Sequence, residues 1–502
     1  MSKQVRVRFA PSPTGPLHIG GVRTALFNYL FAKKNNGVFY LRIEDTDQNR
    51  FVPGAEAYIM EALDWLGIAP SETVGTNEKF GPYRQSERKE IYKQYADQLI
   101  HSGWAYYAFD TAEALDAHRK QHEAEGKTFI YNWHNREKLD TSLVISKEAT
   151  DKRIAAGEDY VIRFKTPVNE TLHLHDIIRG DIKFETNLLD DKVLFKSDGM
   201  PTYHLANIVD DHLMETSHVI RGEEWLPSMP LHSLLYKAFG WEAPEFAHLP
   251  LILKPIGNGK LSKRDGDKMG FPVFPLEWKD ASSMTISSGY REKGFFPEAV
   301  VNFLALLGWN DGTEQEIFTL EELCEKFDLN RVHKAGAKFD PEKNKWFNHH
   351  YLQEQSDESL TKAFAPILIE KEISTQLDVK KIVSLIKERA NFVSEFWELS
   401  DYFFVAPTSY DEKAAKNWKE ETPNLMQQLI SVLENIGDFT SITIETIVKD
   451  WMTKNEIGMG KVMQPFRLSL VGALKGPHLF DIIEVIGKDE TIKRLEKAIT
   501  SL

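Results

Sequence analysis

The segment RFAPSPTGPLHIGG, residues 8–21, combines three prolines, three glycines and one histidine directly after an alternating apolar run. Glycines let the backbone approach a ligand closely, prolines keep the loop stiff, and His18 can donate a hydrogen bond to a phosphoryl oxygen. The spacing matches neither GxxxxGK[ST] nor GxGxxG, which disfavours a Walker-type hydrolase and a dinucleotide oxidoreductase. The turn from Pro11 to Gly21 is therefore a candidate phosphate site of another kind.

A second candidate is the loop GNGKLSKRDGDK, residues 257–268, which collects Lys260, Lys263 and further basic residues between glycines. Mobile cations suit a leaving pyrophosphate, because they can close over charge that grows during the reaction. Taken alone, each motif has a plainer explanation, an ordinary turn for the first and a solvated charge run for the second. Their order along the chain makes the joint interpretation more specific.

The elements around the first turn predict a βαβ unit. Val5, Val7 and Phe9 alternate with polar residues as in a strand, residues 22–37 have helical apolar spacing, and residues 38–47 begin as a second strand. A strand, helix and strand of this length pair in parallel. Ligands bind beyond the carboxyl ends of such strands, where the first turn lies.

The pattern of apolar and charged residues along the chain predicts an α/β protein with a split, Rossmann-like parallel sheet. Residues 98–202 change to a charged helical segment and short strand-like runs, which indicates an α+β insertion. Apolar strands and helices resume at 203–255, so the catalytic domain is expected to comprise 1–97 and 203–255. Residues 349–502 have almost only helical periodicity, which predicts a separate all-α region.

Bulk composition narrows the class of protein. A chain of 502 residues exceeds one hydrophobic core, and no apolar stretch or secretion signal suggests a membrane or an exported protein. The single Cys324 excludes an internal disulfide and cysteine-based zinc sites and favours a reducing cytoplasm. The charge, 61 − 75 = −14, argues against indiscriminate binding to nucleic acid. A local basic track at residues 331–345 is a candidate contact, although a solvated loop and helix end is the favoured explanation.

Several sequence blocks resemble the class I aminoacyl-tRNA synthetases. PSPTGPLHIGG, Pro11 to Gly21, resembles their HIGH-type signature, and KLSKR, Lys260 to Arg264, their KMSKS-type signature. The likeness is closest to the bacterial glutamyl-tRNA synthetases, through RIEDTD (42–47), GPYRQSER (81–88), LFKSDGMPTYHLANIVDDHLM (194–214), HVIRGEEWL (218–226) and VMQPFRLSLVGALKGP (462–477). These blocks are ordered from residue 6 to 477, which is almost the whole chain.

The resemblance implies a glutamate–tRNA ligase. L-glutamate and ATP would give glutamyl-adenylate and diphosphate, and the acyl group would then pass to the 3′ end of tRNA(Glu) for protein biosynthesis. The substrate carboxylate is the nucleophile, so positioning and charge stabilisation carry the rate. Mg²⁺ would travel with ATP and needs no all-protein cage. The family expectation is a cytoplasmic monomer without membrane association.

The resemblance also assigns site residues. Catalytic roles go to His18, Lys260 and Lys263, ATP contacts to Gly20, Gly21, Glu224, Trp225 and Lys263, and glutamate contacts to Arg8, Ser12, Glu44, Tyr203, Asn207 and Arg221. Guanidinium groups at Arg8 and Arg221 suit the carboxylates, and Glu44 suits the α-amino group.

These assignments compete with plainer ones. Arg8 could be a surface charge on a strand, and the acidic residues at 44–47 could cap a helix or bind a metal. The run VDDH, residues 209–212, with His204 and His218, also suggests a metal, but polar capping of the sheet end explains it, so we expect no metal held by the protein.

The sequence departs from the family pattern at two places. Some bacterial members carry a zinc knuckle in the insertion, whereas this chain has Ala108 and Asp110 there, so no zinc is expected and packing alone would hold the insertion. The segment 268–290 after the lysine loop is longer and more aromatic than usual, and its role is open.

For tRNA, the resemblance assigns 98–202 to the acceptor end, 256–348 to the inner stem with the KMSKS-type loop, and 349–502 to the anticodon. We expect Trp346, Trp397 and Trp451 in the core rather than at the RNA.

Four other identities share features of this sequence. A glutaminyl-tRNA synthetase would carry C-terminal β-barrels, which the helical periodicity opposes, and a glutamyl-queuosine enzyme would lack the C-terminal region. A small-molecule nucleotidylyltransferase could use the same turn. A catalytically silent tRNA-binding protein would be expected to have lost His18 or the lysines, which are all present.

Overall fold

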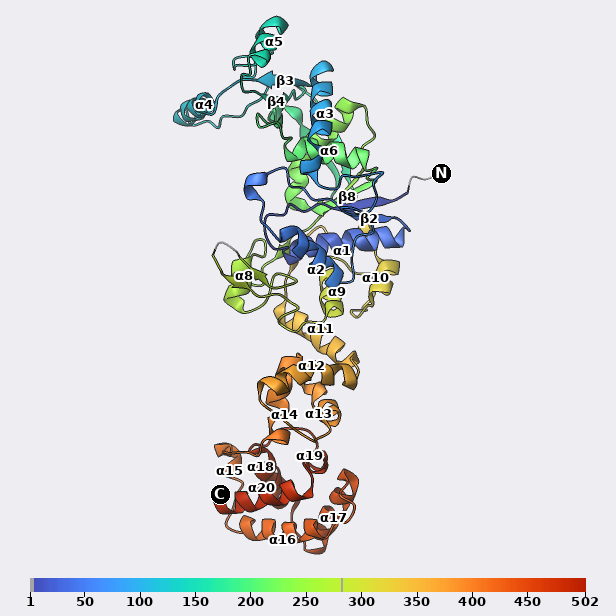
Figure 1. The fold of residues 1–502 in the computed structure, drawn as a ribbon, viewed down its shortest axis with the longest axis vertical. Helices are drawn as coiled ribbons and strands as arrows, with labels where there is room; N and C mark the ends of the chain where they lie inside the picture. The colour runs from blue at the N-terminus through green and yellow to red at the C-terminus, as the bar shows by residue number, and fades with distance from the viewer. Residues whose placement is uncertain (1–3, 281–282) are drawn as a thin grey trace. The chain divides into compact units, whose positions relative to one another are not determined.

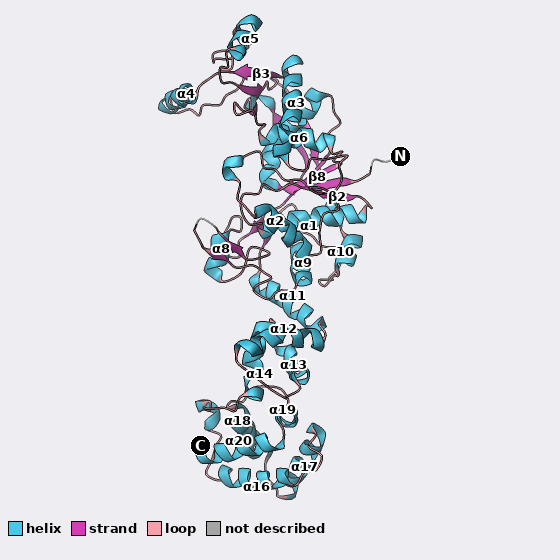
Figure 2. Cartoon of the chain, viewed as in Figure 1, coloured by secondary structure: helices cyan, strands magenta, loops and turns pink. Residues whose placement is uncertain are grey.

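The structure is a computed structural model that describes residues 4–280 and 283–502. Two compact units divide the chain. The first runs to Lys293 and includes Pro297–Pro341, and the second comprises Gly294–Phe296 and Glu342–Leu502. Each is described by itself. Figure 1 labels the elements along the chain, and Figure 2 shows that the strands gather in the N-terminal part.

Two pairs of parallel strands form the base of the first unit: β1 (Arg6–Phe9) with β2 (Val38–Leu41), and β8 (His218–Gly222) with β9 (Glu245–Leu249). The Ser217 N–H donates to the Arg6 carbonyl at 2.9 Å, which joins the two pairs. All four residues of β1 are buried, as is usual for a parallel strand covered on both faces. The expected parallel sheet, interrupted in the sequence by an insertion, is therefore confirmed.

Helix α1 (Ile19–Lys34) begins three residues before the predicted start at residue 22, because His18 caps it. The His18 Nδ1 accepts the Gly20 N–H at 3.1 Å, and the Val273 carbonyl accepts the Ile19 N–H at 2.9 Å. The Gly21 N–H also donates to the His18 carbonyl at 2.8 Å, so three of the four N–H groups that a helix start leaves unpaired are satisfied. The cap fixes the imidazole at the point where the Gly/Pro turn becomes the helix.

The insertion has the predicted α+β character. Its antiparallel sheet has the order β3 (Ala105–Ala108), β4 (Val161–Phe164), β7 (Val193–Phe195), and a separate hairpin joins β5 (Thr171–Asp176) to β6 (Gly180–Glu185). Its helices are α4 (Ala112–Ala124) and α5 (Lys147–Ala155).

Packing alone does not hold the insertion, so that expectation was wrong. Asp191 is fully buried and accepts from the Tyr106 hydroxyl at 2.7 Å, from Arg136 at 3.2 Å and from the Thr166 N–H at 3.1 Å. Asp110 accepts from the Tyr131 hydroxyl at 2.7 Å. A buried carboxylate needs such partners, and here they link strands and loops of the insertion.

The remaining elements of the first unit surround the sheet. They are α2 (Ala55–Trp65), α3 (Lys89–His101), α6 (Tyr203–Leu213), α7 (Met229–Phe239), α8 (Lys263–Met269), α9 (Pro297–Leu306), α10 (Leu320–Lys326), β10 (Ile252–Leu253), β11 (Trp278–Lys279), β12 (Ile286–Ser287) and β13 (Ala337–Lys338), with a 3₁₀ turn at Glu223–Ser228. The long segment after the lysine loop packs on the Gly/Pro turn, since the Phe274 ring meets the His18 ring edge-on at 6.1 Å.

The second unit is built of helices in its described residues (Figure 2). They are α11 (Pro341–Glu354, which starts at the end of the first unit), α12 (Asp357–Glu370), α13 (Val379–Ile386), α14 (Phe396–Phe404), α15 (Glu412–Ala415), α16 (Thr422–Glu434), α17 (Ser441–Lys454), α18 (Met459–Val471), α19 (Leu479–Ile486) and α20 (Lys488–Ser501). One apolar core contains residues of all these helices except α15, and the predicted helical periodicity is confirmed.

One core prediction for this region is wrong. Trp346 on α11 is 44% exposed and stacks on His350, one turn along the same helix, with ring centroids 6.2 Å apart. Helical spacing alone does not say which face of α11 is covered. Trp397 and Trp451 pack against the core, as expected. Across the part of the chain that the structure describes, no helix is long and apolar enough to cross a bilayer.

Candidate active site

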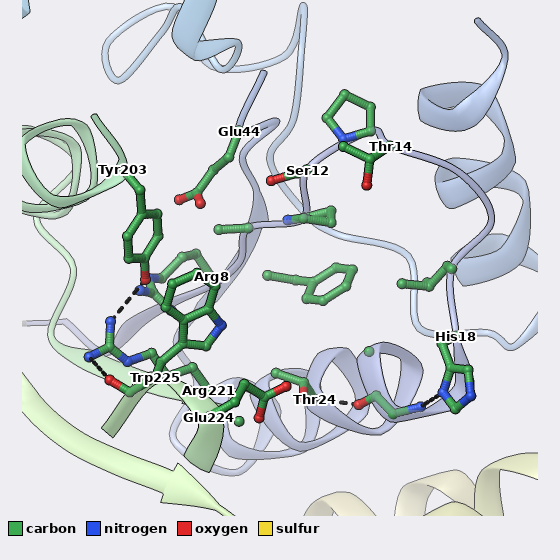
Figure 3. A pocket seen from close by; sticks show the side chains of 18 of the residues that line it. Arg8, Ser12, Thr14, His18, Thr24, Glu44, Tyr203, Arg221, Glu224 and Trp225 are labelled. Atoms are coloured by element: carbon green, nitrogen blue, oxygen red, sulfur yellow. Dashed lines mark hydrogen bonds between the residues drawn. The ribbon is translucent and has the colours of Figure 1, made fainter. Parts of the chain in front are cut away.

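A cavity of about 420 Å³ opens beside the carboxyl ends of β1 and β8. It contains all but one of the residues that the sequence assigned to glutamate and ATP: Arg8, Ser12, His18, Gly20, Gly21, Glu44, Tyr203, Asn207, Arg221, Glu224, Trp225 and Lys260. Figure 3 shows the imidazole at one end and the arginine and tyrosine side chains at the other. The cavity therefore has a phosphate-like end and a carboxylate-like end.

His18 has its proton placed by its own helix cap. Its Nδ1 accepts the Gly20 N–H, so the neutral imidazole carries its proton on Nε2. This Nε2 is buried and has no hydrogen-bond partner among the described residues. Burial, reinforced by the charge of Lys260, lowers the pKa of His18 to about 4. The neutral side chain can therefore donate a hydrogen bond from Nε2 to a bound ligand.

The glycines of the turn leave room for a ligand at the start of α1. Gly20 and Gly21 both line the cavity. A Cβ at Gly21 would lie 2.7 Å from the Leu17 Cδ1, so a larger residue there would have to displace the end of the Leu17 side chain. The helix start presents the positive end of its dipole to an anion.

The lysine loop faces the same turn. Lys260 lines the cavity and its Nζ pairs with the Glu224 Oε1 at 2.7 Å. Lys263, the first residue of α8, lies outside the main cavity. It lines a neighbouring hollow of about 410 Å³ together with His18, Ser12 and Gly21. The two loops, distant in sequence, therefore meet on either side of His18.

At the carboxylate end, Arg8 is held by a buried charge network. Its Nε and Nη2 donate to Asp211 at 3.0 and 3.2 Å, and Arg42 donates to Asp211 at 2.8 Å. Burial opposes ionisation of Asp211, but the two arginines lower its pKa below the usual value. Arg8 is 3% exposed, so the alternative of a surface charge is wrong. Its Nη1 has no partner among the described residues and can serve a ligand.

Arg221 is held in a different way. It donates from Nε to the His248 Nε2 at 3.0 Å, from Nη1 to the Tyr203 hydroxyl at 3.0 Å and to the His232 Nδ1 at 3.3 Å, and from Nη2 to the Trp225 carbonyl at 3.3 Å. Two of these bonds appear in Figure 3. Four of the five guanidinium N–H groups are used, which leaves one on Nη2.

Tyr203 completes this end of the cavity. Because its oxygen accepts from Arg221, its own hydrogen is free for another acceptor. The remaining Arg221 N–H and the Tyr203 O–H together offer two donors, the number that a carboxylate binds side by side. The Tyr203 ring also packs on the Trp225 ring, with centroids 4.3 Å apart.

Glu44 supplies the negative charge of the cavity. Its Oε1 accepts from Arg42 at 2.9 Å and from the Asn207 amide at 3.2 Å, and it is 8% exposed. Burial raises the pKa of Glu44, although Arg42 opposes the shift. The second carboxylate oxygen remains for a cationic group.

The carboxylates of the run 209–212, which could have bound a metal, are bound to arginine side chains. Asp210 accepts from Arg88 at 2.7 Å and from Gln85 and Tyr92 at 2.8 Å, while Asp211 serves Arg8 and Arg42. Over residues 4–280 and 283–502, no cluster of three or more His, Cys, Asp or Glu side chains has the arrangement of a metal site. In the described residues, Asp210 and Asp211 therefore bind neighbouring side chains at the sheet end.

Sequence reasoning missed three residues behind Arg221. His248 faces Arg221 in the parallel register of β9 and β8, Asp176 ends β5, and His232 lies on α7. All three are fully buried. Only the strand register could have indicated His248, because no local motif marks any of them.

The family model for the class I (E and Q) tRNA synthetase catalytic domain matches residues 4–346, and an anticodon binding domain model matches residues 352–499. The chain belongs to the class I tRNA synthetases for glutamate and glutamine. The two family matches together span both units of the structure.

Similar proteins within this family are full-length matches. The glutamate–tRNA ligase of Flavobacterium johnsoniae is 84% identical over 503 residues and that of Flavobacterium psychrophilum is 79% identical, each with 100% of both chains covered. A crystal structure of a glutamate tRNA ligase from Elizabethkingia meningosepticum, in complex with its amino acid, matches with a TM-score of 0.97 at 54% identity and covers 100% of each chain.

Proposed function

We propose that the chain is a glutamate–tRNA ligase, which uses ATP to activate L-glutamate and transfers it to the 3′ end of tRNA(Glu). The observation that carries this proposal is the single cavity that combines a neutral imidazole donor with an arginine and tyrosine pair suited to a carboxylate. The full-length likeness to glutamate–tRNA ligases supports it. The helical second unit favours it over a glutaminyl enzyme with β-barrels.

In the first step, a glutamate carboxylate oxygen attacks the α-phosphorus of ATP, and the bond from that phosphorus to the bridging oxygen breaks to release diphosphate. His18 would donate from Nε2 to an α-phosphate oxygen, and Gly20 and Gly21, which carry no side chains, would let the phosphate approach the positive end of the α1 dipole. Lys260 and Lys263 would neutralise the departing diphosphate. Mg²⁺ bound to ATP supplies further charge neutralisation, and no protein-held zinc is part of the proposal.

The carboxylates and the α-ammonium group of glutamate would each bind a residue of opposite charge, which would orient the amino acid. Arg8, Arg221 and Tyr203 would bind its carboxylates, Glu44 would accept from its α-ammonium group, and Ser12 and Asn207 would add hydrogen bonds. Glu224 and Trp225 would line the adenosine side.

In the second step, a hydroxyl of the 3′-terminal ribose attacks the acyl carbon and AMP leaves. Residues 98–202 would bind the acceptor end, 256–348 the inner stem and 349–502 the anticodon, as in the family pattern. We place the enzyme in the cytoplasm as a monomer.

Amino-acid-dependent pyrophosphate exchange tests the proposal. Each of the twenty amino acids is supplied with ATP, with and without tRNA(Glu). Exchange that depends on glutamate supports the proposal. Exchange supported by glutamine instead would move the chain to the glutaminyl branch of the family, and exchange with none of them would refute amino-acid activation.

A further inference from the structure

Two buried arginines of the cavity, Arg23 and Arg221, bind no carboxylate among the described residues, and Arg23 donates only to the Leu307 and Pro250 carbonyls, whereas Arg221 is held by side chains. Arg8, Arg42 and Arg88 each bind a carboxylate directly. Arg221 is 5% exposed, yet among the described residues its partners are a phenol, a peptide carbonyl and two imidazoles. A buried charge without a counter-ion is costly, so its retention calls for a functional explanation.

The proton positions behind Arg221 follow from its chemistry. A guanidinium only donates, so the His248 Nε2 facing it carries no proton and acts as the acceptor. The proton of His248 therefore sits on Nδ1 and is donated to the Asp176 Oδ2 at 2.6 Å. The other Asp176 oxygen accepts the Ile178 and Arg179 N–H groups at 3.0 and 2.9 Å. Asp176 thus fixes one tautomer of His248.

His232 accepts from a different nitrogen of the same guanidinium, Nη1. Its Nδ1 accepts from Arg221, so its proton lies on Nε2 and is donated to the His204 Nδ1 at 3.1 Å. Burial and the neighbouring Arg221 charge lower the pKa of His232 well below its ordinary value. Both imidazoles are therefore neutral acceptors that orient Arg221 without cancelling its charge.

We propose that Asp176, His248 and His232 are positioning residues of the glutamate site, which hold Arg221 through neutral acceptors and so reserve its positive charge for a substrate carboxylate. The inference rests on the proposed function. The surrounding network of Arg8, Arg42 and Arg88 with Asp210, Asp211 and Glu44 balances three cations with three anions. The charge on Arg221 then matches the single net negative charge of glutamate.

Asp176→Asn tests the tautomer step. The amide oxygen would stay with the Ile178 and Arg179 N–H groups, which places the amide NH₂ against the His248 Nδ1. His248 would then have to carry its proton on Nε2, facing the Arg221 N–H, as in the tautomer error of an Asp-to-Asn change in a catalytic triad. The variant preserves size and removes the acceptor.

The assay is tRNA-dependent aminoacylation with glutamate varied at saturating ATP, and then with ATP varied at saturating glutamate. For Asp176→Asn we expect the KM for glutamate to rise about 10- to 100-fold, as for loss of a hydrogen bond from a charged group. The KM for ATP should stay within about twofold, because the change does not reach the triphosphate end. Asp181→Asn is the matched control, since the Asp181–His175 pair lies exposed on the same hairpin.

A second pair of variants keeps the test decisive if Asp176→Asn does not fold. His232→Asn retains an acceptor near the position of Nδ1, and His232→Leu has none. We expect the KM for glutamate to rise strongly with leucine and to recover at least fivefold with asparagine, roughly half of the hydrogen-bond effect on a logarithmic scale.

Three results would overturn the inference: an unchanged KM for glutamate in Asp176→Asn, an equal rise in the KM for ATP, or identical defects in the two His232 variants. A wild-type enzyme that does not use glutamate would instead refute the proposed function itself.

Discussion

His18 has two separable functions, and His18→Asn separates them. The imidazole caps α1 through Nδ1, which accepts the Gly20 N–H at 3.1 Å, and presents an Nε2 donor that has no partner among the described residues. The asparagine Oδ1 can accept the same N–H, and asparagine is among the best N-cap residues. Its shorter side chain leaves nothing at the Nε2 position. His18→Ala removes both functions.

The expected magnitudes differ accordingly. Loss of one donor to developing charge lowers turnover by roughly 10² to 10³, which corresponds to about 2.7–4 kcal/mol. Loss of the cap costs about 1 kcal/mol of unfolding free energy, and both variants lose the contact with Phe274. We therefore expect equal losses of turnover, whereas His18→Asn should be about 1 kcal/mol more stable than His18→Ala.

Pyrophosphate exchange at saturating glutamate and ATP gives the turnover, and urea unfolding gives the stability. Wild-type turnover in His18→Asn would remove the imidazole donor from the mechanism. Equal stability of the two variants would contradict the capping role.

Four further results are expected. Arg221→Lys should raise the KM for glutamate at least tenfold with normal folding by circular dichroism, because one ammonium cannot replace the forked donors; an unchanged KM would refute the pocket assignment. Lys263→Ala should lower the rate of exchange by about 10² or less with little change in the KM for glutamate; a selective glutamate defect would place this lysine elsewhere. Burial lowers the pKa of His18 from 6.5 to about 4. The neutral imidazole therefore contributes fully to the free energy of unfolding above pH 6.5, and this contribution falls by up to about 3 kcal/mol as the pH drops through 4. Acid unfolding should accordingly be less steep in His18→Asn. Dialysis against a zinc chelator followed by Mg²⁺ should leave the melting temperature and activity unchanged, and a loss restored by zinc would contradict the assignment of no protein-held zinc.

Local patterns made part of this structure predictable. The alternation in β1, the Gly/Pro turn and the helical apolar spacing after it are each encoded within a few residues, so the parallel strands and the phosphate end could be inferred. The order of the motifs along the chain then allowed us to predict that His18 and the lysine loop lie at the same site.

Other features depend on tertiary contacts that no local pattern contains. An arginine on a strand, such as Arg8, looks the same in the sequence whether its side chain is exposed or buried. The partner that allows Arg8 to be buried, Asp211, is distant in the chain. The His248 partner of Arg221 follows from strand register, and Asp176 reaches it from the inserted hairpin. For Trp346, the helical period gave the element and not the side that faces the core.

A crystal structure with a non-hydrolysable glutamyl-adenylate analogue would test the central claim most directly. We predict that the His18 Nε2 lies within hydrogen-bond distance of the group that replaces the phosphate, while Arg221 and Tyr203 together bind a glutamate carboxylate. An analogue bound with its phosphate mimic away from His18, or with no carboxylate at Arg221 and Tyr203, would contradict the account.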